Sequence, residues 1–115
     1  MEQPQPPAGS FEADSSGLTH DGRSLPVLVA TVSPAYFDSL KAQPLLGRSF
    51  VASDYGGARP TAVLAHAVWE ELFQGSPTVI GTEVSIGGGP AIVVGIMPEG
   101  LRPPPDAGVY VPAHH

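Results

Sequence analysis

The sequence predicts one small α+β domain in which a mixed or antiparallel sheet packs against two short helices. Several short runs of β-branched and apolar residues are typical of strands, and two segments place apolar residues at helical spacing. The 14 glycines and 14 prolines among 115 residues favour short elements joined by many turns. A chain of this length forms a single domain with its own core.

The first segment, residues 1–24, contains few large apolar side chains, so we expect it to be flexible or loosely attached. The folded domain is expected to start at Leu25 and to cover residues 25–115. Residues 25–32 (LPVLVATV) form the first predicted strand because they are apolar and β-branched.

A first helix is predicted over residues 33–41, because a serine that can cap it is followed by a proline. Its buried face would consist of Tyr36, Phe37 and Leu40. A turn is predicted at Gly47, and the glycines and proline of residues 53–60 indicate a loop.

A second buried strand is predicted over residues 61–65 (TAVLA). The helix that follows has apolar residues at intervals of three and four, and Gly75 and Pro77 end it. These apolar positions are Ala65, Val68, Trp69, Leu72 and Phe73.

The sequence of the C-terminal part predicts a hairpin and one further strand. Residues 83–86 and 91–97 form two strands joined by a turn at residues 87–90 (GGGP). Residues 98–105 are predicted to form an extended linker, and residues 109–112 are predicted to form a short strand. Because this last strand contains Pro112, we expect it at the edge of the sheet.

Composition argues against several classes of function. The chain has 5 Lys and Arg against 11 Asp and Glu, a net charge of -6, so it is poorly suited to bind nucleic acid or anionic lipid. It has no cysteine, no GxSxG nucleophile motif and no convincing carboxylate pair. We therefore predict a non-catalytic protein without a cofactor.

One residue pair has metal-ligand spacing. His66 and Glu70 stand four residues apart on the second predicted helix, which can present two ligands to one ion. A third ligand would have to come from Asp54, Asp38 or His20, and nothing in the sequence marks one. We therefore favour a capping or surface role for His66, with the metal-dependent enzyme as an alternative.

Three residues are expected to have structural roles. Arg48 follows the predicted turn and precedes Asp54 by six residues, so its guanidinium suits a clamp across this connection. Trp69 is predicted to anchor its helix in the core, with an exposed partner-binding role as the alternative.

His114 and His115 at the end of the sequence are interpreted as the remnant of a purification tag.

Seven short segments, in order, resemble one known family. They are residues 32–37 (VSPAYF), 44–50 (PLLGRSF, followed by Asp54), 62–66 (AVLAH), 69–73 (WEELF), 77–81 (PTVIG), 92–98 (IVVGIMP) and 109–112 (VYVP). This order is similar to the periplasmic core domain of MacB/FtsX-like ABC transporter permeases. Residues 94–101 (VGIMPEGL) most resemble the orphan permeases often seen in acidobacteria.

The resemblance implies a location and a role. It places the chain in the periplasmic part of an inner-membrane permease, where it looks similar to the lobe called the Sabre subdomain. Relatives couple cytoplasmic ATP hydrolysis to periplasmic movement, so the implied partners are the permease's transmembrane helices, an ABC ATPase, and a periplasmic adaptor or lipoprotein. The family pattern supplies no catalytic residues.

We therefore predict a stiff extracytoplasmic module that moves as a unit and contacts a substrate or partner. The predicted contact loops are residues 55–59, with Tyr55 and Arg59, and residues 102–106, with Arg102 and Asp106. The alternative is a free-standing binding module for a peptide or a carbohydrate.

Overall fold

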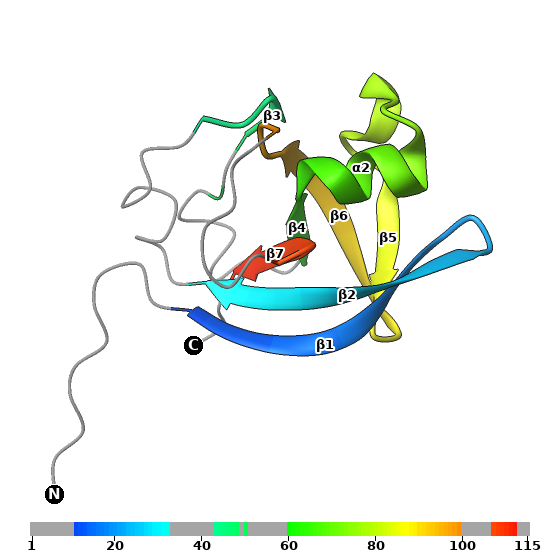
Figure 1. Ribbon diagram of the computed structural model, residues 1–115, viewed down its shortest axis with the longest axis vertical. Helices are drawn as coiled ribbons and strands as arrows, with labels where there is room; N and C mark the ends of the chain where they lie inside the picture. Colours follow the sequence, from blue (N-terminus) through cyan, green and yellow to red (C-terminus); the bar gives the residue numbers. More distant parts are fainter. Residues whose placement is uncertain (1–10, 33–42, 49, 51–59, 100–106, 113–115) are drawn as a thin grey trace, which may run out of the picture.

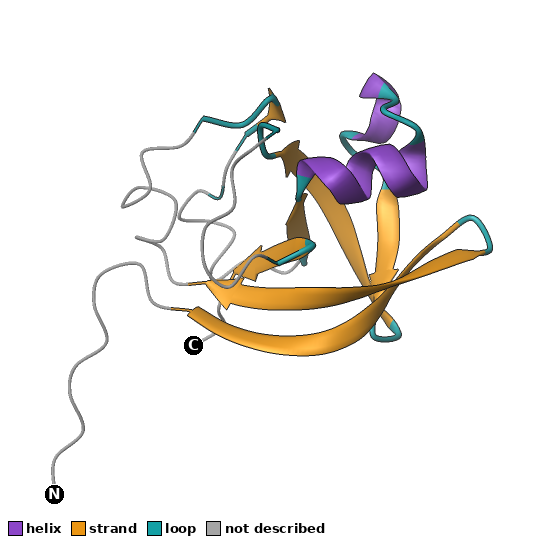
Figure 2. Ribbon diagram, in the orientation of Figure 1, coloured by secondary structure: helices purple, strands orange, loops and turns teal. Residues whose placement is uncertain are grey.

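The structure is a computed structural model and describes residues 11–32, 43–48, 50, 60–99 and 107–112. These residues form seven strands, one α-helix and one 3-10 helix (Figures 1 and 2). The elements are β1 (Phe11–His20), β2 (Arg23–Val32), β3 (Leu46–Gly47), β4 (Thr61–Leu64), α2 (His66–Phe73), η2 (Pro77–Val79), β5 (Glu83–Ile86), β6 (Gly89–Ile96) and β7 (Val109–Pro112). The helix predicted over residues 33–41 lies outside the described residues.

Six of the strands close into a barrel. The strand order is β6-β4-β7-β2-β1-β5, and β5 pairs back to β6 while β3 adds to β6 alongside. The β2–β7 and β4–β6 pairs are parallel, and the other pairs are antiparallel. The predicted mixed sheet is thus confirmed. Its closure was not predicted, and the described part is richer in strand and poorer in helix than expected.

The first strand corrects the interpretation of residues 1–24. β1 pairs with β2 along its whole length, from Phe11 opposite Val32 to His20 opposite Arg23. Its sequence is polar because much of it faces solvent, and of its described side chains only Leu18 is buried. Backbone pairing, which leaves no apolar pattern in the sequence, therefore orders the segment. Residues 1–10 lie outside the described residues.

The inner core fills the barrel and continues under α2. The helix lies over one end of the barrel (Figure 1). Its side chains Val68, Trp69, Leu72 and Phe73 are buried and belong to the inner core. Below them, the inward-facing strand residues include Leu18, Ala62, Leu64, Val93 and Val109. The predicted second helix and its apolar face are confirmed.

A second cluster lies on the outer face of the barrel wall. It consists of Ala30, Val32, Val63, Val94, Met97, Ala107 and Tyr110, and Phe50 packs against it. All four residues of β4 are buried because the inner and outer clusters cover its two faces. This explains why residues 61–64 form an uninterrupted apolar run rather than an alternating pattern.

The predicted hairpin is confirmed, and its turn also closes the barrel. Gly87 and Gly88 have φ values of 59° and 91°, which suits a two-residue turn between β5 and β6. The Gly87 N–H donates to the Gly17 carbonyl at 2.9 Å. Next to this bond, β5 pairs with β1 through Leu18 opposite Ile86.

The expected edge position of the last strand is wrong. β7 lies between β2 and β4, so it is an interior strand of the barrel. Its pairing with β4 involves Val109 and Tyr110, whereas Pro112 is the last residue of the strand. A proline at the end of a strand, beyond the pairing on one side, removes little from the hydrogen-bond ladder.

The first testable prediction concerns β1. Leu18→Ala removes a fully buried side chain at the closure of the barrel. It should lower the free energy of unfolding by about 2–5 kcal/mol, measured by urea denaturation followed by circular dichroism.

The control for this measurement is Ser15→Ala, on the exposed part of the same strand, which should change stability by less than about 0.5 kcal/mol. Equal stability of the Leu18→Ala variant and the unaltered chain would mean that β1 does not belong to the fold.

Candidate functional site

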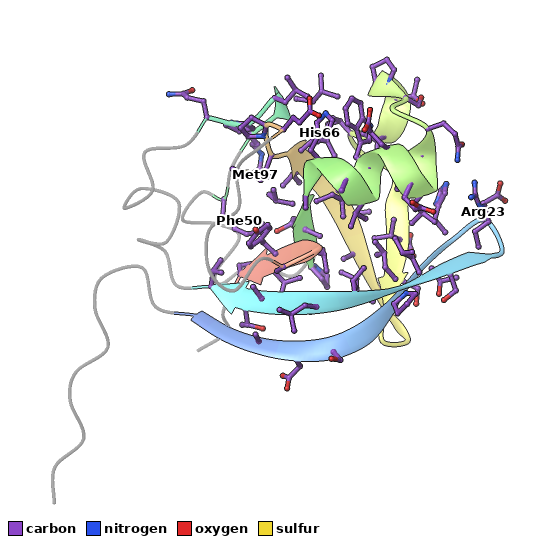
Figure 3. The ribbon with its side chains drawn as sticks, in the orientation of Figure 1. Arg23, Phe50, His66 and Met97 are labelled. Atoms are coloured by element: carbon purple, nitrogen blue, oxygen red, sulfur yellow. The ribbon has the colours of Figure 1, made fainter. Side chains whose placement is uncertain are left out.

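The start of α2 carries the predicted metal-ligand pair. His66 lies at the start of the helix (Figure 3). Its Nδ1 lies 3.7 Å from Glu70 Oε1, and its ring meets the Trp69 ring edge-on with centroids 5.3 Å apart. The N-cap residue is Ala65, whose side chain makes no capping hydrogen bond, so the predicted capping role of His66 is wrong. His66 is the first residue of the helix, where its ring packs on Trp69 instead.

The structure brings no third ligand to this pair among the residues it describes. His20 lies elsewhere: its ring stacks on Phe73 with centroids 4.5 Å apart, and its Nδ1 is 3.4 Å from the Glu83 carbonyl oxygen. Asp38 and Asp54 lie outside the described residues. The described geometry therefore gives a two-residue surface contact at the start of a helix, which does not define a metal site.

Trp69 ties α2 to the segment that follows it. The residue is 9% exposed, and its Nε1–H donates to the Ser76 carbonyl oxygen at 2.9 Å. The Ser76 hydroxyl in turn accepts from the Thr78 N–H and so caps η2. Trp69 thus occupies the position expected of a core anchor, with its one polar group hydrogen-bonded.

A clasp formed by residues 45–48 lies against β6. The Leu45 N–H donates to the Ile96 carbonyl at 2.7 Å, and the Arg48 N–H donates to the Val94 carbonyl at 2.8 Å. Two glycines, Gly47 and Gly95, face each other within the clasp.

Neither glycine of the clasp has room for a side chain. Gly47 has a φ of +69°, and a Cβ there would fall on the Val94 carbonyl oxygen. A Cβ on Gly95 would fall on the Arg48 carbonyl oxygen. Sequence reasoning missed Gly95, although a glycine inside a predicted strand is the signal for such a close approach.

The pairing of β4 with β6 contains a β-bulge beside the clasp. The β4–β6 register shifts by one residue between Ala62 and Val63, so that Val63 lies opposite Gly95 and not opposite Val94. A bulge of this kind bends the strand locally and re-aims its backbone groups. The bulge lies where β6 pairs with β4 on one side and with the clasp on the other.

Two exposed apolar side chains lie here, Leu45 within the clasp and Ile80 next to it. Leu45 is 49% exposed and Ile80 is 38% exposed, the two large apolar residues that remain exposed among the described positions. The Ile80 side chain reaches the position above Gly47, so η2 and the clasp meet here. Arg48, predicted to bridge this connection, is an exposed residue at the end of the clasp.

Several predicted site residues lie outside the described part of the chain. These are Asp54, Tyr55, Arg59, Arg102, Asp106, His114 and His115. Within the described part, no helix has both the length and the apolar character needed to cross a bilayer.

The family of the chain is established by its sequence. Residues 6–115 match the model of the MacB-like periplasmic core domain, and the chain therefore belongs to this family. The family resemblance and the extracytoplasmic location predicted from the sequence are both confirmed.

Solved structures share the fold. The extracellular domain of the noncanonic ABC-type transporter YknZ from Gram-positive bacteria superposes with a TM-score of 0.77 at 23% identity, covering 91% of this chain and 53% of that one. The periplasmic region of MacB from Actinobacillus actinomycetemcomitans gives a TM-score of 0.77 at 18% identity, covering 91% and 47%.

A third structure, a domain of a putative permease protein from Porphyromonas gingivalis, gives a TM-score of 0.68 at 13% identity, covering 91% and 45%. The chain thus spans about half the length of these solved domains. The search of curated proteins gave no match.

The clasp generates a second prediction. Gly95→Ala places a methyl group on the Arg48 carbonyl oxygen, so the clasp has to move away from β6. Stability should fall by about 1–3 kcal/mol, and hydrogen exchange should accelerate at the Leu45 and Arg48 amides.

Gly89→Ala is the matched control, since it lies in the same strand and its Cβ would meet nothing closer than the Ile86 carbonyl oxygen at 3.7 Å. If the two alanine variants behave alike, the close approach of the clasp is refuted.

A third prediction tests the hydrogen bond by which Trp69 holds α2 to the segment that follows it. Trp69→Phe keeps an aromatic ring in the core but removes the donor to the Ser76 carbonyl. The free energy of unfolding should fall by about 1–2 kcal/mol. It is measured by circular dichroism, because the substitution removes the one tryptophan of the chain and with it the fluorescence signal. Unchanged stability would mean that this hydrogen bond contributes nothing to holding α2 against the segment that follows it.

Proposed function

We propose that this domain is a non-catalytic relay in an ABC transporter permease, moving as a rigid unit and contacting substrate or partner during export. The observation that carries the proposal is the closed barrel in a chain of the MacB-like periplasmic core domain family. A closed sheet whose core is filled resists bending, so a displacement applied to one part is passed to the rest. Family membership favours this role over the free-standing binding module.

β1 begins and β7 ends at the same end of the barrel, which suits a relay. β1 begins and β7 ends on either side of Val32, with Phe11 opposite Val32 on one side and Pro112 opposite it on the other. Both strands therefore connect to the rest of the protein at the end of the barrel away from α2. A movement of the connected parts would reach this end first.

The described residues that follow the two predicted contact loops lie at opposite ends of the barrel. Residues 55–59 lead to Pro60 and β4, which begins at the end away from α2. Residues 102–106 lead to Gly108, whose carbonyl accepts from the Ala65 N–H at 2.9 Å just before α2. We propose that one loop meets a partner near each end, which suits transmission between two bodies.

In the parent system the proposed partners are the permease's own transmembrane helices, an ABC ATPase and a periplasmic adaptor or lipoprotein. The exposed Leu45 and Ile80 beside the clasp offer a small apolar contact for such a partner. The acidic character of the chain, with a net charge of -6, favours a partner surface that is basic or apolar.

The proposal is tested by locking the barrel within the full permease. Thr19 and Ser85 are register partners across the β1–β5 closure, and the chain has no native cysteine. In a Thr19→Cys/Ser85→Cys variant, oxidation to the disulfide should leave export and its coupled ATP hydrolysis within about twofold of the reduced form. A body that moves without changing shape tolerates an internal crosslink.

The single variant Thr19→Cys under the same oxidant controls for other effects of oxidation. Replacement of the domain by a flexible linker should abolish the coupling, because nothing then transmits the displacement. Loss of export only in the oxidised double variant would show that the barrel has to open or deform, and the rigid relay would be abandoned.

A further inference from the structure

β1 extends past the point at which it closes the barrel. It pairs with β2 along its whole length, but it pairs with β5 only through Leu18 and Thr19. On the side away from β2, residues 11–16 therefore have no strand partner among the residues that the structure describes. Residues 13–15 are exposed. The first half of β1 is thus a free edge of the sheet.

The backbone groups of this free edge can be assigned from one hydrogen bond. The Gly17 carbonyl accepts from the Gly87 N–H, so Gly17 presents its backbone groups to the side away from β2. Backbone groups alternate sides along a strand and the β1–β2 register is unbroken, so Ala13 and Ser15 present theirs to the same side. Exposed N–H and C=O groups in such a row are a template for an added strand.

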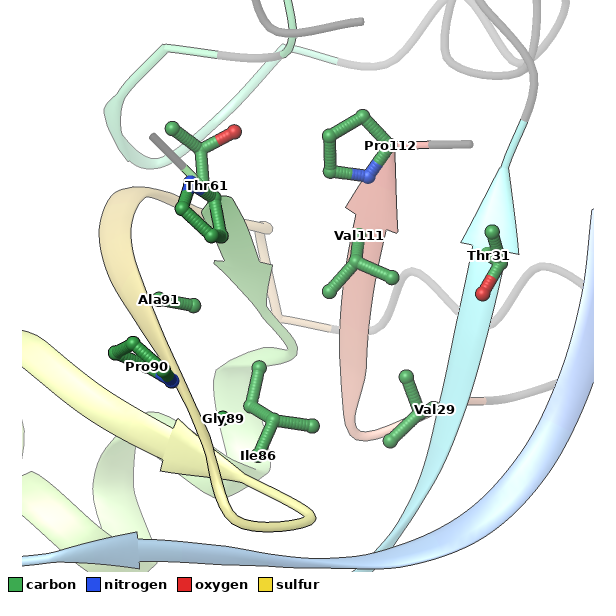
Figure 4. Close-up of a pocket in the computed structure, with 10 residues that line it drawn as sticks. Val29, Thr31, Thr61, Ile86, Gly89, Pro90, Ala91, Val111 and Pro112 are labelled. Atoms are coloured by element: carbon green, nitrogen blue, oxygen red, sulfur yellow. The ribbon is translucent and has the colours of Figure 1, made fainter. Parts of the chain in front are cut away.

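The free edge is also acidic. β1 carries Glu12 and Asp14 and has no lysine or arginine. Asp14 lies directly opposite Val29, which lines a cavity of about 260 Å³ at the end of the barrel away from α2 (Figure 4). None of the residues lining this cavity is basic, and Asp14 makes no ion pair within the described part of the chain. A basic residue opposite Asp14 in an added strand would therefore complement its charge.

The same charges oppose pairing with a second copy of the chain. An antiparallel pairing of two β1 edges centred on Ala13 places Glu12 opposite Asp14. Centred on Glu12 or Asp14, it places that residue opposite its own copy. Centred on Ser15, it requires the Gly17 carbonyl, which is already hydrogen-bonded. Like charges at directly opposed positions destabilise a pair of strands, so the edge selects against itself.

We infer that the free edge of β1 binds an extended segment of a partner protein by strand addition, and that this segment alternates β-branched with basic residues. The β-branched residues lie opposite the small side chains of Ala13 and Ser15, and a lysine or arginine lies opposite Asp14. Backbone hydrogen bonds hold the segment, and its alternation decides which partner is accepted. This inference does not depend on the proposed relay.

Hydrogen exchange of the unliganded 115-residue chain tests whether the edge is free. The amides of Ala13 and Ser15 should exchange at least about tenfold faster than those of Asp14 and Ser16, which face β2. Comparable protection of all four amides would mean that another part of the chain or a second copy covers the edge, and the inference would be abandoned.

The probe is the peptide acetyl-Val-Lys-Val-Lys-Val-amide, titrated into the isotope-labelled chain and followed by amide chemical shifts. Saturable shifts centred on residues 11–17 are expected, with a dissociation constant on the order of 1 mM, as suits so short a ligand. The matched peptide with glutamate in place of lysine should bind at least about fivefold more weakly. Equal binding of the two peptides, or no saturation by the lysine peptide up to about 10 mM, would overturn the inference.

Two changes test the backbone pairing from either side. Methylation of the central valine nitrogen removes a donor aimed at β1 and should abolish binding, whereas methylation of a lysine nitrogen, which points away, should change the affinity less than about threefold. In the chain, Ala13→Pro removes an outward N–H and leaves the β1–β2 ladder intact, so it should also abolish binding. Equal effects of the two methylations, or retained binding by folded Ala13→Pro, would refute strand addition.

The charge preference is tested by Asp14→Asn, which should weaken the lysine peptide about 2- to 5-fold. Asp21→Asn is the matched control, because it makes the same change of charge at the turn between β1 and β2 and should alter the affinity less than about 1.5-fold. Equal losses in the two variants would mean that the peptide responds only to net charge, and the assignment of Asp14 would fail.

Discussion

The pairing of β1 with β5 is the constraint on which the rest of the structure depends. Only two residue pairs form it, Leu18 with Ile86 and Thr19 with Ser85, next to the hydrogen bond from Gly87 to Gly17. Without this contact the sheet would be open, with an exposed edge on both β1 and β5. With it, the inward side chains of six strands enclose one core, and α2 covers one end of that core.

Closure through so short a contact requires long strands that bridge the barrel. β1 and β2 are ten residues each and β6 is eight. β6 serves three partners, since it pairs with β5 along its first half and with both β4 and the clasp along its second half. Gly95 makes the last arrangement possible, because any side chain at this position would hold the clasp away from the strand.

The two ends of the barrel differ in how they are filled. At one end, α2 inserts four buried side chains, and Trp69 fixes the helix to the segment that follows. At the other end no described helix covers the strand ends, and a cavity of about 260 Å³ lined by Val29, Ile86 and Val111 remains. The proposed relay needs the stiffness that the first end supplies.

The sequence by itself determined the elements whose signals are local. Glycines at residues 87–89 predicted the hairpin, apolar spacing over residues 65–73 predicted α2, and β-branched runs predicted β2, β4 and β6. The order of short motifs also predicted the family to which the chain belongs. Little of the candidate site could be predicted, since Gly95 acquires its role only from the clasp, which lies far away in the chain.

Only the tertiary structure decided which strands are neighbours. The polar segment Phe11–His20 is a strand because β2 and β5 bind its backbone, and a strand ending in proline lies inside the barrel because its pairing with β4 stops before Pro112. Strand pairing is made by backbone groups that every residue carries, so side-chain patterns record it weakly. Closure of the barrel follows from such non-local pairing, and a one-dimensional reading of the sequence could not supply it.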